Sequence, residues 1–425
     1  MKKYFNISLT AIMALTFNIY FSGCVKEVPC HKTYTYSYYN PVYKTTAEVR
    51  ANIKSNPSRD VQNPGKLYIL GKYIFLNEID KGIHIIDNSN PSSPKNVAFI
   101  DVPGNVDMAV KGNTLYADLY SDLVTIDITN PLNIVVKKYN EGVFPYRAYG
   151  NGFYNDTNKI IVDWIKRDTM VTQDCMSSYG MLEDRSVFFL AASNSSGDGS
   201  SKASVSPIGQ GGSMARFAIV NNRMYAVSNS DLNVFNISSP NDPAFSNTVN
   251  LNNWAIETIF PFKNKLFIGS QNGMFIYDIS NPDNPAPAGQ FAHVRSCDPV
   301  IADDSFAYVT LRSGTACQGF TNQLDVLQLN NLTDPQLLKS YDFTNPHGLS
   351  KDGNILFVCD GSAGLKVYDA SDVKNLKLIK QISLETYDVI AYNNIALVVA
   401  KDGLYQYDYS KVNEIKLLSK IGILR

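Results

Sequence analysis

The stretch IYDISNPDNP, residues 276 to 285, places an aliphatic and aromatic strand end, an Asp and an Asn-Pro turn within ten residues. Nearly the same phrase returns as HIIDNSNPSSP at 84 to 94, VTIDITNPLN at 124 to 133 and NVFNISSPNDP at 233 to 243. Such repetition indicates an array of similar structural units. The phrase therefore bears on architecture and says little about chemistry.

The polar residue of each phrase is predicted to organise a turn. It ends a strand, where its side chain can accept hydrogen bonds from backbone N–H groups of the next turn, and the Asn-Pro that follows ends the ladder. Each of these residues belongs to a different unit beside the same turn signal, which argues against a calcium or acid/base array. The residues are Asp87, Asp127, Asn236, Asp278, Asp369 and Asp408.

One complete unit, residues 105 to 144, shows what is repeated. VDMAVKG and NTLYADLY are two short strands that meet at a Gly-Asn turn, DLVTIDITN is a third, and IVVKKYN after the Pro is a fourth. Units of about 40 residues with four strands are typical of propeller blades. Comparable units begin near Pro64, Ala215, Ile256, Cys297, His347 and Tyr387.

The spacing of the phrases predicts the number of blades. The interval from Asp127 to Asn236 is much longer than two repeats, so one irregular unit is expected there. Its start, FPYRAYGNGFY followed by KIIVDWIKRDTMVT, favours a first and a long second strand, and the Gly/Ser-rich segment 193–213 is expected to be a mobile loop. We favour an all-β propeller of eight four-stranded blades with the third irregular. Seven blades with a large insertion at 146–213 is the alternative.

Composition excludes one class of partner. The chain has 425 residues, a formal net charge of −1 and a pI of about 6.4. Its longest basic runs are pairs such as Lys137-Lys138, so nucleic acid is not an expected partner.

The N-terminus is predicted to be an export signal. Lys2 and Lys3 precede an apolar stretch from Ile7 to Phe21, and FSGC ends it with small residues before Cys24. This resembles a bacterial lipobox, in which Cys24 becomes the lipidated first residue after cleavage. An ordinary signal peptide or an uncleaved anchor is the alternative. We therefore expect a signal peptide at 1–23, a lipid-anchored tether at 24–48 and one propeller domain at 49–425.

Four stretches resemble a known family. They are GKLYILGKYIFLNEIDKGIHIIDNSNPSSP, GSMARFAIVNNRMYAVSNSDLNVFNIS, CDPVIADDSFAYVTLRSGTACQG and LFVCDGSAGLKVYDASD. They are similar to the LVIVD-repeat lipoproteins common in Bacteroidetes-type bacteria. The resemblance implies a β-propeller on an outer-membrane lipoprotein, facing the periplasm or the cell surface, and supplies no activity.

The cysteines fit export to an oxidising compartment. Cys297 and Cys317 flank the first two strands of one unit and are expected to form a disulfide there. With Cys24 lipidated, at least one of Cys30, Cys175 and Cys359 stays free or pairs between molecules.

Catalytic signatures are missing from the sequence. It has no G-x-S-x-G elbow, phosphate-binding P-loop, H-E-x-x-H or C-x-x-C pair. Its four histidines lack metal-ligand spacing, so neither a metal nor a cofactor is expected. The missing motifs weaken the enzyme hypothesis without excluding it.

One set of polar residues is a candidate site. The first strand of each propeller blade lines the central channel, so polar residues where these strands begin converge at one mouth. They could bind a sugar, a peptide terminus or an ion, or they could tie adjacent blades together. The candidates are Asp107, Arg147, Arg216, Glu257, Asp298, His347 and Asp388.

Three functions follow from these observations. The first is a non-enzymatic platform, anchored to the membrane by lipid, that binds a protein, a glycan or another envelope component. The second is a hydrolase or lyase in which Asp298, His347 and Glu257 are acid/base groups and Arg216 holds an anionic substrate. The third is a structural subunit of an envelope complex. An open polar funnel favours a ligand or substrate, and a plugged mouth favours assembly through outer surfaces.

Overall fold

The computed structural model describes residues 31–145, 159–174, 209–253, 255–293, 299–314 and 321–423. The chain divides into two compact units. One comprises Met1–Val42 and Asp163–Ser186, and we call it the ribbon unit. The other comprises Tyr43–Val162 and Val187–Arg425, and we call it the propeller unit.

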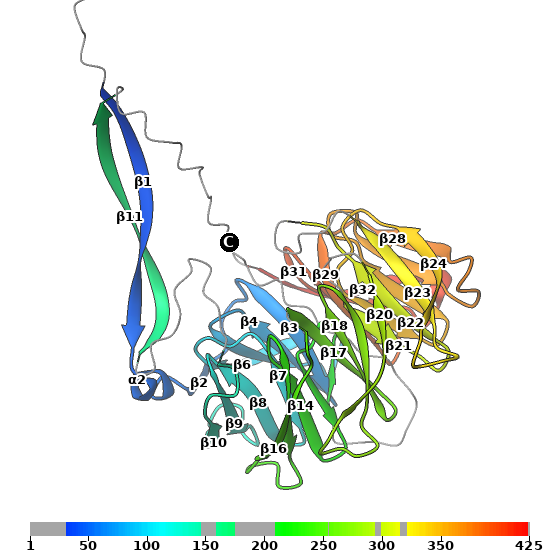
Figure 1. Cartoon of the computed structure of the whole chain (residues 1–425), viewed down its shortest axis with the longest axis horizontal. Coiled ribbons are helices and arrows are strands. Elements are labelled where there is room, and N and C mark those ends of the chain that lie inside the picture. Colours follow the sequence, from blue (N-terminus) through cyan, green and yellow to red (C-terminus); the bar gives the residue numbers. More distant parts are fainter. Residues whose placement is uncertain are drawn as a thin grey trace, which may run out of the picture. The chain divides into compact units, whose positions relative to one another are not determined.

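The propeller unit contains seven four-stranded antiparallel blades, which follow one another in chain order (Figure 1). Blades 1 to 7 are β3–β6, β7–β10, β13–β16, β17–β20, β21–β24, β25–β28 and β29–β32. Their bounds are β3 (Pro64–Leu70), β4 (Tyr73–Glu78), β5 (Gly82–Asp87), β6 (Lys95–Asp101), β7 (Met108–Lys111), β8 (Thr114–Leu119), β9 (Asp122–Asp127), β10 (Val135–Asn140), β13 (Phe217–Val220), β14 (Arg223–Val227), β15 (Asp231–Asn236), β16 (Ala244–Asn250), β17 (Ile256–Phe262), β18 (Lys265–Ser270), β19 (Gly273–Asp278), β20 (Ala286–Ala292), β21 (Val300–Ala302), β22 (Phe306–Leu311), β23 (Gln323–Gln328), β24 (Gln336–Asp342), β25 (Leu349–Asp352), β26 (Ile355–Cys359), β27 (Leu365–Asp369), β28 (Lys377–Ile382), β29 (Thr386–Tyr392), β30 (Ile395–Ala400), β31 (Gly403–Asp408) and β32 (Lys416–Gly422).

Four short elements complete the propeller unit's described part. β2 (Lys54–Pro57) pairs with the outer edge of blade 1, and β12 (Gln210–Gly211) pairs with its inner edge. The helix α2 (Thr46–Arg50) begins with a capping box, in which Thr45 and Glu48 bond each other's backbone N–H groups. A 3-10 turn, η1 (Val412–Glu414), precedes β32. No helix among the described residues is long and apolar enough to cross a membrane.

The first strands form the inner ring. Each of β3, β7, β13, β17, β21 and β25 contacts the first strand of the next blade, and β29 of blade 7 contacts β3 of blade 1. The second and third strands are buried on both sides, because each blade is covered by its neighbours. Their sequences are consequently almost continuously apolar, while the fourth strands β20, β24 and β32 carry only exposed and half-buried side chains.

Side chains close the ring between its two ends. Asn88 of blade 1 and Gln406 of blade 7 exchange two amide hydrogen bonds, at 3.0 and 2.7 Å. Ser419 on β32 donates to the Pro91 carbonyl at 2.7 Å, and Val61 forms a parallel bridge with Ile423. Blades 1 and 7 are therefore joined without exchange of a strand between them.

The turn function predicted for the repeated phrase is confirmed. At all six positions the side-chain oxygen accepts the backbone N–H two residues later, at 2.6 to 2.9 Å. The hydroxyl and backbone N–H of Thr129, with help from Lys137, lower the pKa of Asp127 to about 2. Ser280 and Lys265 do the same for Asp278.

The phrase also connects neighbouring blades. Four residues after its polar residue, a backbone carbonyl accepts a side-chain hydroxyl from the preceding part of the ring. Tyr116 of blade 2 bonds Pro240 of blade 3 at 2.8 Å, and Tyr225 of blade 3 bonds Pro282 of blade 4 at 2.9 Å. The carbonyl at the same position accepts a hydroxyl in three further hydrogen bonds. They run from Ser419 to Pro91, from Ser55 to Pro131 and from Tyr341 to Val373. Proline suits this position because it leaves the ladder and its carbonyl remains free to accept.

A glycine begins the third strand of three blades, and directly precedes it in blade 6, because the fourth strand passes very close there. A Cβ on Gly82 would collide with the Ile100 carbonyl of β6. The same collision with a fourth-strand carbonyl is found at Gly273, Gly364 and Gly403. Only glycine permits this approach.

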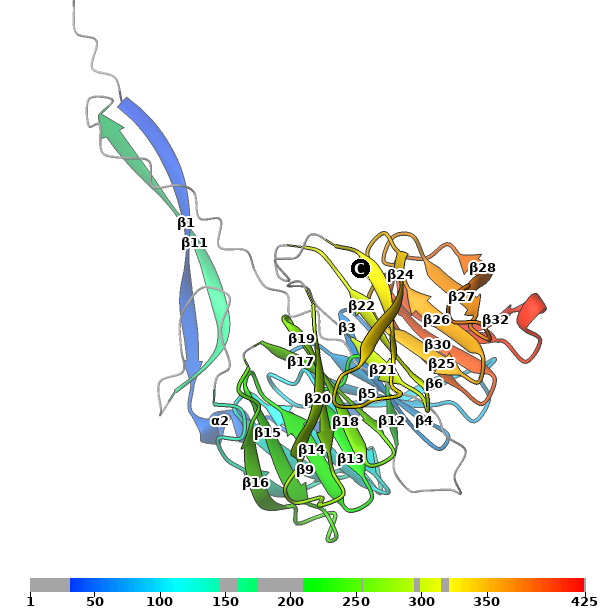
Figure 2. The ribbon, with the colours of Figure 1, turned by 45° about the vertical axis from the view of Figure 1, so that its right-hand side comes forward.

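The ribbon unit's described strands form a twisted two-stranded sheet (Figure 1, Figure 2). They are β1 (His31–Lys44) and β11 (Ile160–Asp174). The favoured eight-blade interpretation is wrong, and the seven-blade alternative is confirmed. The strand predicted at KIIVDWIKRDTMVT exists, but it pairs with β1 instead of founding a blade, because alternation specifies a strand and leaves its partner open.

Candidate functional site

Five of the seven predicted mouth residues lie in the described part of the chain, at the starts of inner strands or next to them. They are Asp107, Arg216, Glu257, His347 and Asp388. Arg147 and Asp298 lie outside the described residues, as do Cys24, Cys30, Cys175 and the expected disulfide partners Cys297 and Cys317. Cys359 is a buried free thiol whose pKa is raised well above its usual value by burial.

Asp107 is the centre of a buried bridge between blades 1, 2 and 3. Its Oδ2 accepts from Lys66 Nζ on β3 at 2.5 Å and from the Arg216 backbone N–H at 2.5 Å. Its Oδ1 accepts from the Met108 backbone N–H. Lys66 and Asp107 side chains are only 1% and 3% exposed, so this ion pair is almost free of solvent screening. Burial lowers the pKa of Lys66, and Asp107 opposes that shift.

Arg216 continues the link around the ring. Its guanidinium Nη2 lies 3.4 Å from the Ile256 carbonyl of blade 4. The neighbouring Ala215 carbonyl accepts from the Ile259 backbone N–H at 2.7 Å. In this arrangement Asp107 and Arg216 connect adjacent blades.

Asp388 of blade 7 lies near enough to the same cluster for the charges of Lys66 and Asp107 to act on it. It is buried, and its Oδ1 accepts the Val389 backbone N–H at 2.9 Å. A Cβ on either Gly212 or Gly348 would collide with the Asp388 carboxyl group, so only glycine fits on its two sides. Burial raises the pKa of Asp388 well above its usual range, against the opposing influence of Lys66. The shift favours the neutral acid.

The segment 209–213 lies on the channel side of the inner ring, beside Asp388. β12 pairs antiparallel with β3 on the inner side of the ring, with Gln210 opposite Ile69 and Gly211 opposite Tyr68. The backbone N–H of Gly209 bonds the Val110 carbonyl at 3.0 Å. Ser213 Oγ accepts the Leu349 backbone N–H of blade 6 at 2.5 Å. The segment thus contacts blades 1, 2 and 6, and we call it the plug.

The plug corrects the prediction of a mobile loop at 193–213 for its last five residues. The remainder of that segment lies outside the described residues. Glycines are needed here because a Cβ on Gly209 would meet Tyr68 and the Ile69 carbonyl. Composition alone favoured a flexible linker, whereas these glycines allow close packing against β3.

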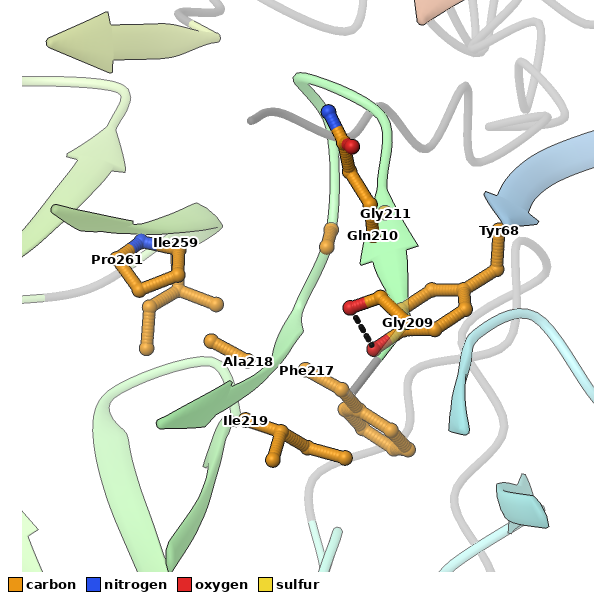
Figure 3. Close-up of a pocket in the computed structure, with 10 residues that line it drawn as sticks. Tyr68, Gly209, Gln210, Gly211, Phe217, Ala218, Ile219, Ile259 and Pro261 are labelled. Atoms are coloured by element: carbon orange, nitrogen blue, oxygen red, sulfur yellow. Dashed lines mark hydrogen bonds between the residues drawn. The ribbon is translucent and has the colours of Figure 1, made fainter. Parts of the chain in front are cut away.

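A cavity of about 110 Å³ remains beside the plug (Figure 3). Figure 3 shows the Tyr68 hydroxyl bonded to the Gly209 carbonyl, at 3.0 Å, on one side of it. Phe217, Ile219 and Ile259 of blades 3 and 4 also line it. Sites for small molecules usually measure about 300 to 1,000 Å³, so this cavity suits water better than a substrate.

His347, the predicted acid/base group, is buried in a setting that disfavours its charged form. Its side chain packs edge-on against Tyr387, with ring centroids 5.5 Å apart, and Asn345 Nδ2 lies 3.1 Å from Nε2. Burial, assisted by the charge of Arg312, lowers its pKa to about 3. Imidazole is therefore neutral at physiological pH, when it can accept a proton only weakly.

Glu257 lies at the start of blade 4. Its Oε1 accepts from Gln271 Nε2 at 3.0 Å, and its charge acts against the burial-driven lowering of the Arg312 pKa. Within the part of the chain that the structure describes, no three His, Cys, Asp or Glu side chains are grouped so that they could hold a metal ion.

A larger hollow lies between blades 3 and 4, and no residue of the plug lines it. It measures about 350 Å³, and we call it the blade 3/4 groove. The turns β13–β14, β17–β18 and β19–β20 line it, with exposed Asn221, Asn222, Lys263 and Asn264. Its volume reaches the range of small-ligand sites, and its amide groups can both donate and accept hydrogen bonds.

The groove has a fixed frame. Arg223 of blade 3 forms a two-pronged ion pair with Asp283 of blade 4, with both N···O distances 2.7 Å. Asn264 Nδ2 donates to Ser280 Oγ at 2.8 Å. Bidentate pairs of this kind orient their partners firmly, so the groove is preformed.

Sequence reasoning missed Lys66, the plug and the groove. Lys66 stands in GKLYIL, where a single lysine in a strand is usually solvent-facing. The groove is formed from three short turns that are separated in sequence and have ordinary turn composition. A signal was available only for the plug, as the glycines at 209, 211 and 212.

Comparisons with known proteins agree with this architecture. The profile of the LVIVD repeat matches residues 64–101, 104–139 and 264–292. No curated protein gives a significant match. Among solved structures, the periplasmic gluconolactonase PpgL of Pseudomonas aeruginosa is 12% identical with a TM-score of 0.53, covering 84% of this chain and 96% of that one.

Two further solved structures share the fold. A protein from Lactobacillus plantarum is 12% identical with a TM-score of 0.51, over 85% of this chain and 98% of that one. The computationally designed protein Ika8 is 10% identical with a TM-score of 0.51, over 85% and 88%. At this identity the likeness concerns the fold alone. The chain therefore carries LVIVD repeats, a β-propeller-type repeat, in blades 1, 2 and 4 of a seven-bladed ring.

Proposed function

We propose that this protein is a lipid-anchored platform outside the cytoplasm, which binds a protein or glycan of the cell envelope through the outer surface of its propeller. The single observation that supports this most is the plug. Segment 209–213 occupies the channel where a propeller enzyme would admit its substrate, and the cavity beside it measures only about 110 Å³. Binding is thereby directed to surfaces other than the channel.

The charges around the plug support the same proposal. Asp107 and Lys66 bond each other in a buried pair, and His347 is held neutral by its surroundings. Groups with these partners stabilise the ring. The hydrolase or lyase alternative would need such groups to reach a substrate.

The blade 3/4 groove is the proposed docking surface. It is preformed by the Arg223–Asp283 pair, and its exposed amides suit hydroxyl groups of a glycan or the backbone of an extended peptide. The anchor is inferred from the N-terminal sequence ending in FSGC, which resembles a lipobox.

Capture from intact envelopes tests the groove. The tagged full-length protein is cross-linked in cells, purified, and its companions are identified by mass spectrometry. Asn264→Arg fills the groove with a large charged side chain. Asn354→Arg is the matched control, because Asn354 occupies the same turn position in blade 6, where its carbonyl accepts the Ala370 N–H as that of Asn264 accepts the Ile279 N–H.

A companion captured by the wild type and by Asn354→Arg, and lost with Asn264→Arg, supports the proposal. Retention by both variants would place binding elsewhere. A glycan companion is distinguished from a protein by its resistance to protease digestion.

The anchor has its own test. Cys24→Ser should abolish labelling by a fatty-acid analogue and release the protein from the membrane fraction, because no other residue can replace the lipidated cysteine. Continued labelling would contradict the lipobox assignment.

A further inference from the structure

The two strands of the ribbon unit present different side chains on their two faces. Thr33 Oγ1 lies 3.2 Å from Thr172 Oγ1, and Ser37 Oγ donates to Asp168 Oδ1 at 2.5 Å, so one register holds over these residues. Side chains alternate across a strand, which places Thr33, Thr35 and Ser37 on one face and three tyrosines on the other. The tyrosines are Tyr34, Tyr36 and Tyr38.

The tyrosine face is open to solvent. The side chains of Tyr34, Tyr36 and Tyr38 are 44 to 49% exposed, and the Tyr34 and Tyr36 rings lie with centroids 6.3 Å apart. A row of exposed tyrosines is unusual outside interfaces, because the ring is a large apolar surface.

The outer edge of β1 carries neither a charge nor a proline over residues 33–40. Among the described residues β1 pairs only with β11, so no described strand pairs with its other edge. From Thr33 to Tyr43 it carries no charged side chain, and its one proline, Pro41, follows residues 33–40, while β11 carries Asp163, Lys166, Arg167 and Asp168. An uncharged, β-prone edge is what proteins avoid unless another strand pairs with it. Two-stranded ribbons are also marginal alone in water, and added strands stabilise them.

We propose that two copies of this chain associate through the free edges of their β1 strands, antiparallel, with Tyr36 opposite Tyr36 of the second copy. The result is a four-stranded sheet in the order β11, β1, β1, β11. This interface belongs to the ribbon unit and is independent of what the propeller binds.

The sequence of β1 is self-complementary in this register. A two-fold axis at Tyr36 sets Tyr34 opposite Tyr38, so all six tyrosines form a single ladder on one face. It also sets Thr35 opposite Ser37 on the other face. Moving the axis to Thr35 or Ser37 leaves two tyrosine pairs instead of three. Aromatic pairs and Thr–Ser pairs are among the favourable cross-strand pairs.

Charge favours a second copy over a different partner strand. A strand that carries charge would leave those charges without complements along residues 33–43, whereas β1 itself brings none. Association through like surfaces about a two-fold axis is the commonest arrangement of homo-oligomers.

Disulfide trapping in cells tests the register. In the full-length protein, Tyr36→Cys places two cysteines directly opposite each other, within the Cα separation that a disulfide needs. Thr35→Cys is the matched control, because Thr35 opposes Ser37 and lies diagonally from its own copy. We expect at least a fivefold stronger disulfide-linked dimer on a non-reducing gel for Tyr36→Cys than for Thr35→Cys or the wild type. Adding Ser37→Cys to Thr35→Cys should restore the band.

A second measurement does not depend on cysteine chemistry. The wild-type protein purified in detergent should sediment as a dimer, and Tyr36→Lys, which sets two charges together at the axis, should sediment as a monomer. Met170→Lys, a 76% exposed position on β11, should remain a dimer.

The outcomes are distinct. A monomeric wild type, or equal bands for Tyr36→Cys and Thr35→Cys, overturns the proposal. Labelling of Tyr36→Cys by a lipid-phase reagent without a dimer band would instead place the tyrosines against the membrane. Loss of the dimer leaves envelope capture by the groove unaffected, so failure here is separable from failure of the proposed function.

Discussion

An exposed strand edge can pair with a strand of another molecule, and the blades and the ribbon differ in how far their edges prevent this. In all seven blades the pairing of the third and fourth strands is interrupted by a register shift, the mark of a β-bulge. Lysines on β10, β24, β28 and β32, and Pro287 on β20, add further protection. β1 has neither charge nor proline over residues 33–40.

The blade edges have features that discourage association, and the edge of β1 lacks them over residues 33–40. Bulges and lysines discourage another strand from adding to a blade, while a smooth uncharged edge invites one. The two parts also differ in what stabilises them. Many buried side chains stabilise the ring, whereas few stabilise the ribbon. Substitutions should therefore affect unfolding most at the ring's centre and least in the ribbon.

Asp107→Leu should have the largest effect on the free energy of unfolding. It leaves Lys66 buried without its ion-pair partner, which typically costs about 3 to 5 kcal/mol. Chemical denaturation of the purified protein measures this. The double variant Lys66→Met/Asp107→Leu should recover part of the loss, because it no longer leaves the Lys66 ammonium buried without its partner. If the double variant is as unstable as the single one, the loss comes from packing and the ion pair is not its cause.

His347 should make the ring sensitive to mild acid. Its folded pKa of about 3 lies below the unfolded value near 6.5, so the unfolded chain binds the extra proton. Stability is fully present above pH 6.5 and falls as the pH drops toward 3. Between pH 7.5 and 5.0 the expected loss is about 2 kcal/mol. His347→Gln, which cannot titrate, should show a flatter profile, and identical slopes for both proteins would refute this.

The turn at Asp127 should contribute less. Asp127→Ala removes the acceptor for Thr129 and should cost about 1 kcal/mol at pH 7, as is usual for one hydrogen-bonded group. The folded pKa of about 2 lies below the unfolded value near 3.8, so this stability is present above pH 3.8 and is lost as the pH falls through 2. Asp127→Asn should be nearly neutral, since Asn236 accepts the same bond in blade 3. An equal loss from both substitutions would show that charge, and not the hydrogen bond, matters.

The ribbon should give the smallest effect on unfolding. Replacing Tyr34, Tyr36 and Tyr38 together by Ser removes exposed side chains, so the thermal midpoint of the propeller should not change. Scanning calorimetry at low protein concentration checks this, while sedimentation of the same protein should show loss of the dimer. A lowered propeller midpoint would mean that these tyrosines are covered in the folded chain.

Sequence patterns predicted what depends on neighbours in the chain. The blade strands, the turns at Asp87 and its equivalents, and the ring arrangement follow from local periodicity and Asx chemistry. The number of blades could not be predicted in this way. Ile160–Asp174 has the pattern of a strand, but the strand with which it pairs, β1, is more than a hundred residues away in the chain. Local pattern cannot distinguish a strand within a blade from one that pairs elsewhere.

At the centre of the ring, too, local sequence could not predict contacts between residues that are distant in the chain. Asp107, Arg216 and Asp388 could be placed near the inner strands because they stand at equivalent positions in successive repeats. The plug could not, since Gly209 and Gly212 read equally as flexible linker and as close packing against Tyr68 and Asp388. Only the three-dimensional neighbours decide between these meanings of glycine.

The manner of ring closure bears on how such a protein can change over evolutionary time. The four strands of each blade come from one uninterrupted stretch of chain, and the ends meet through the side chains of Asn88 and Gln406 and one isolated bridge at Val61 instead of a shared blade. Duplication of one stretch would therefore add a whole blade without dividing another. The copy would bring its own carbonyl acceptor for the blade before it, so the ring size of this architecture is open to revision by a single genetic event.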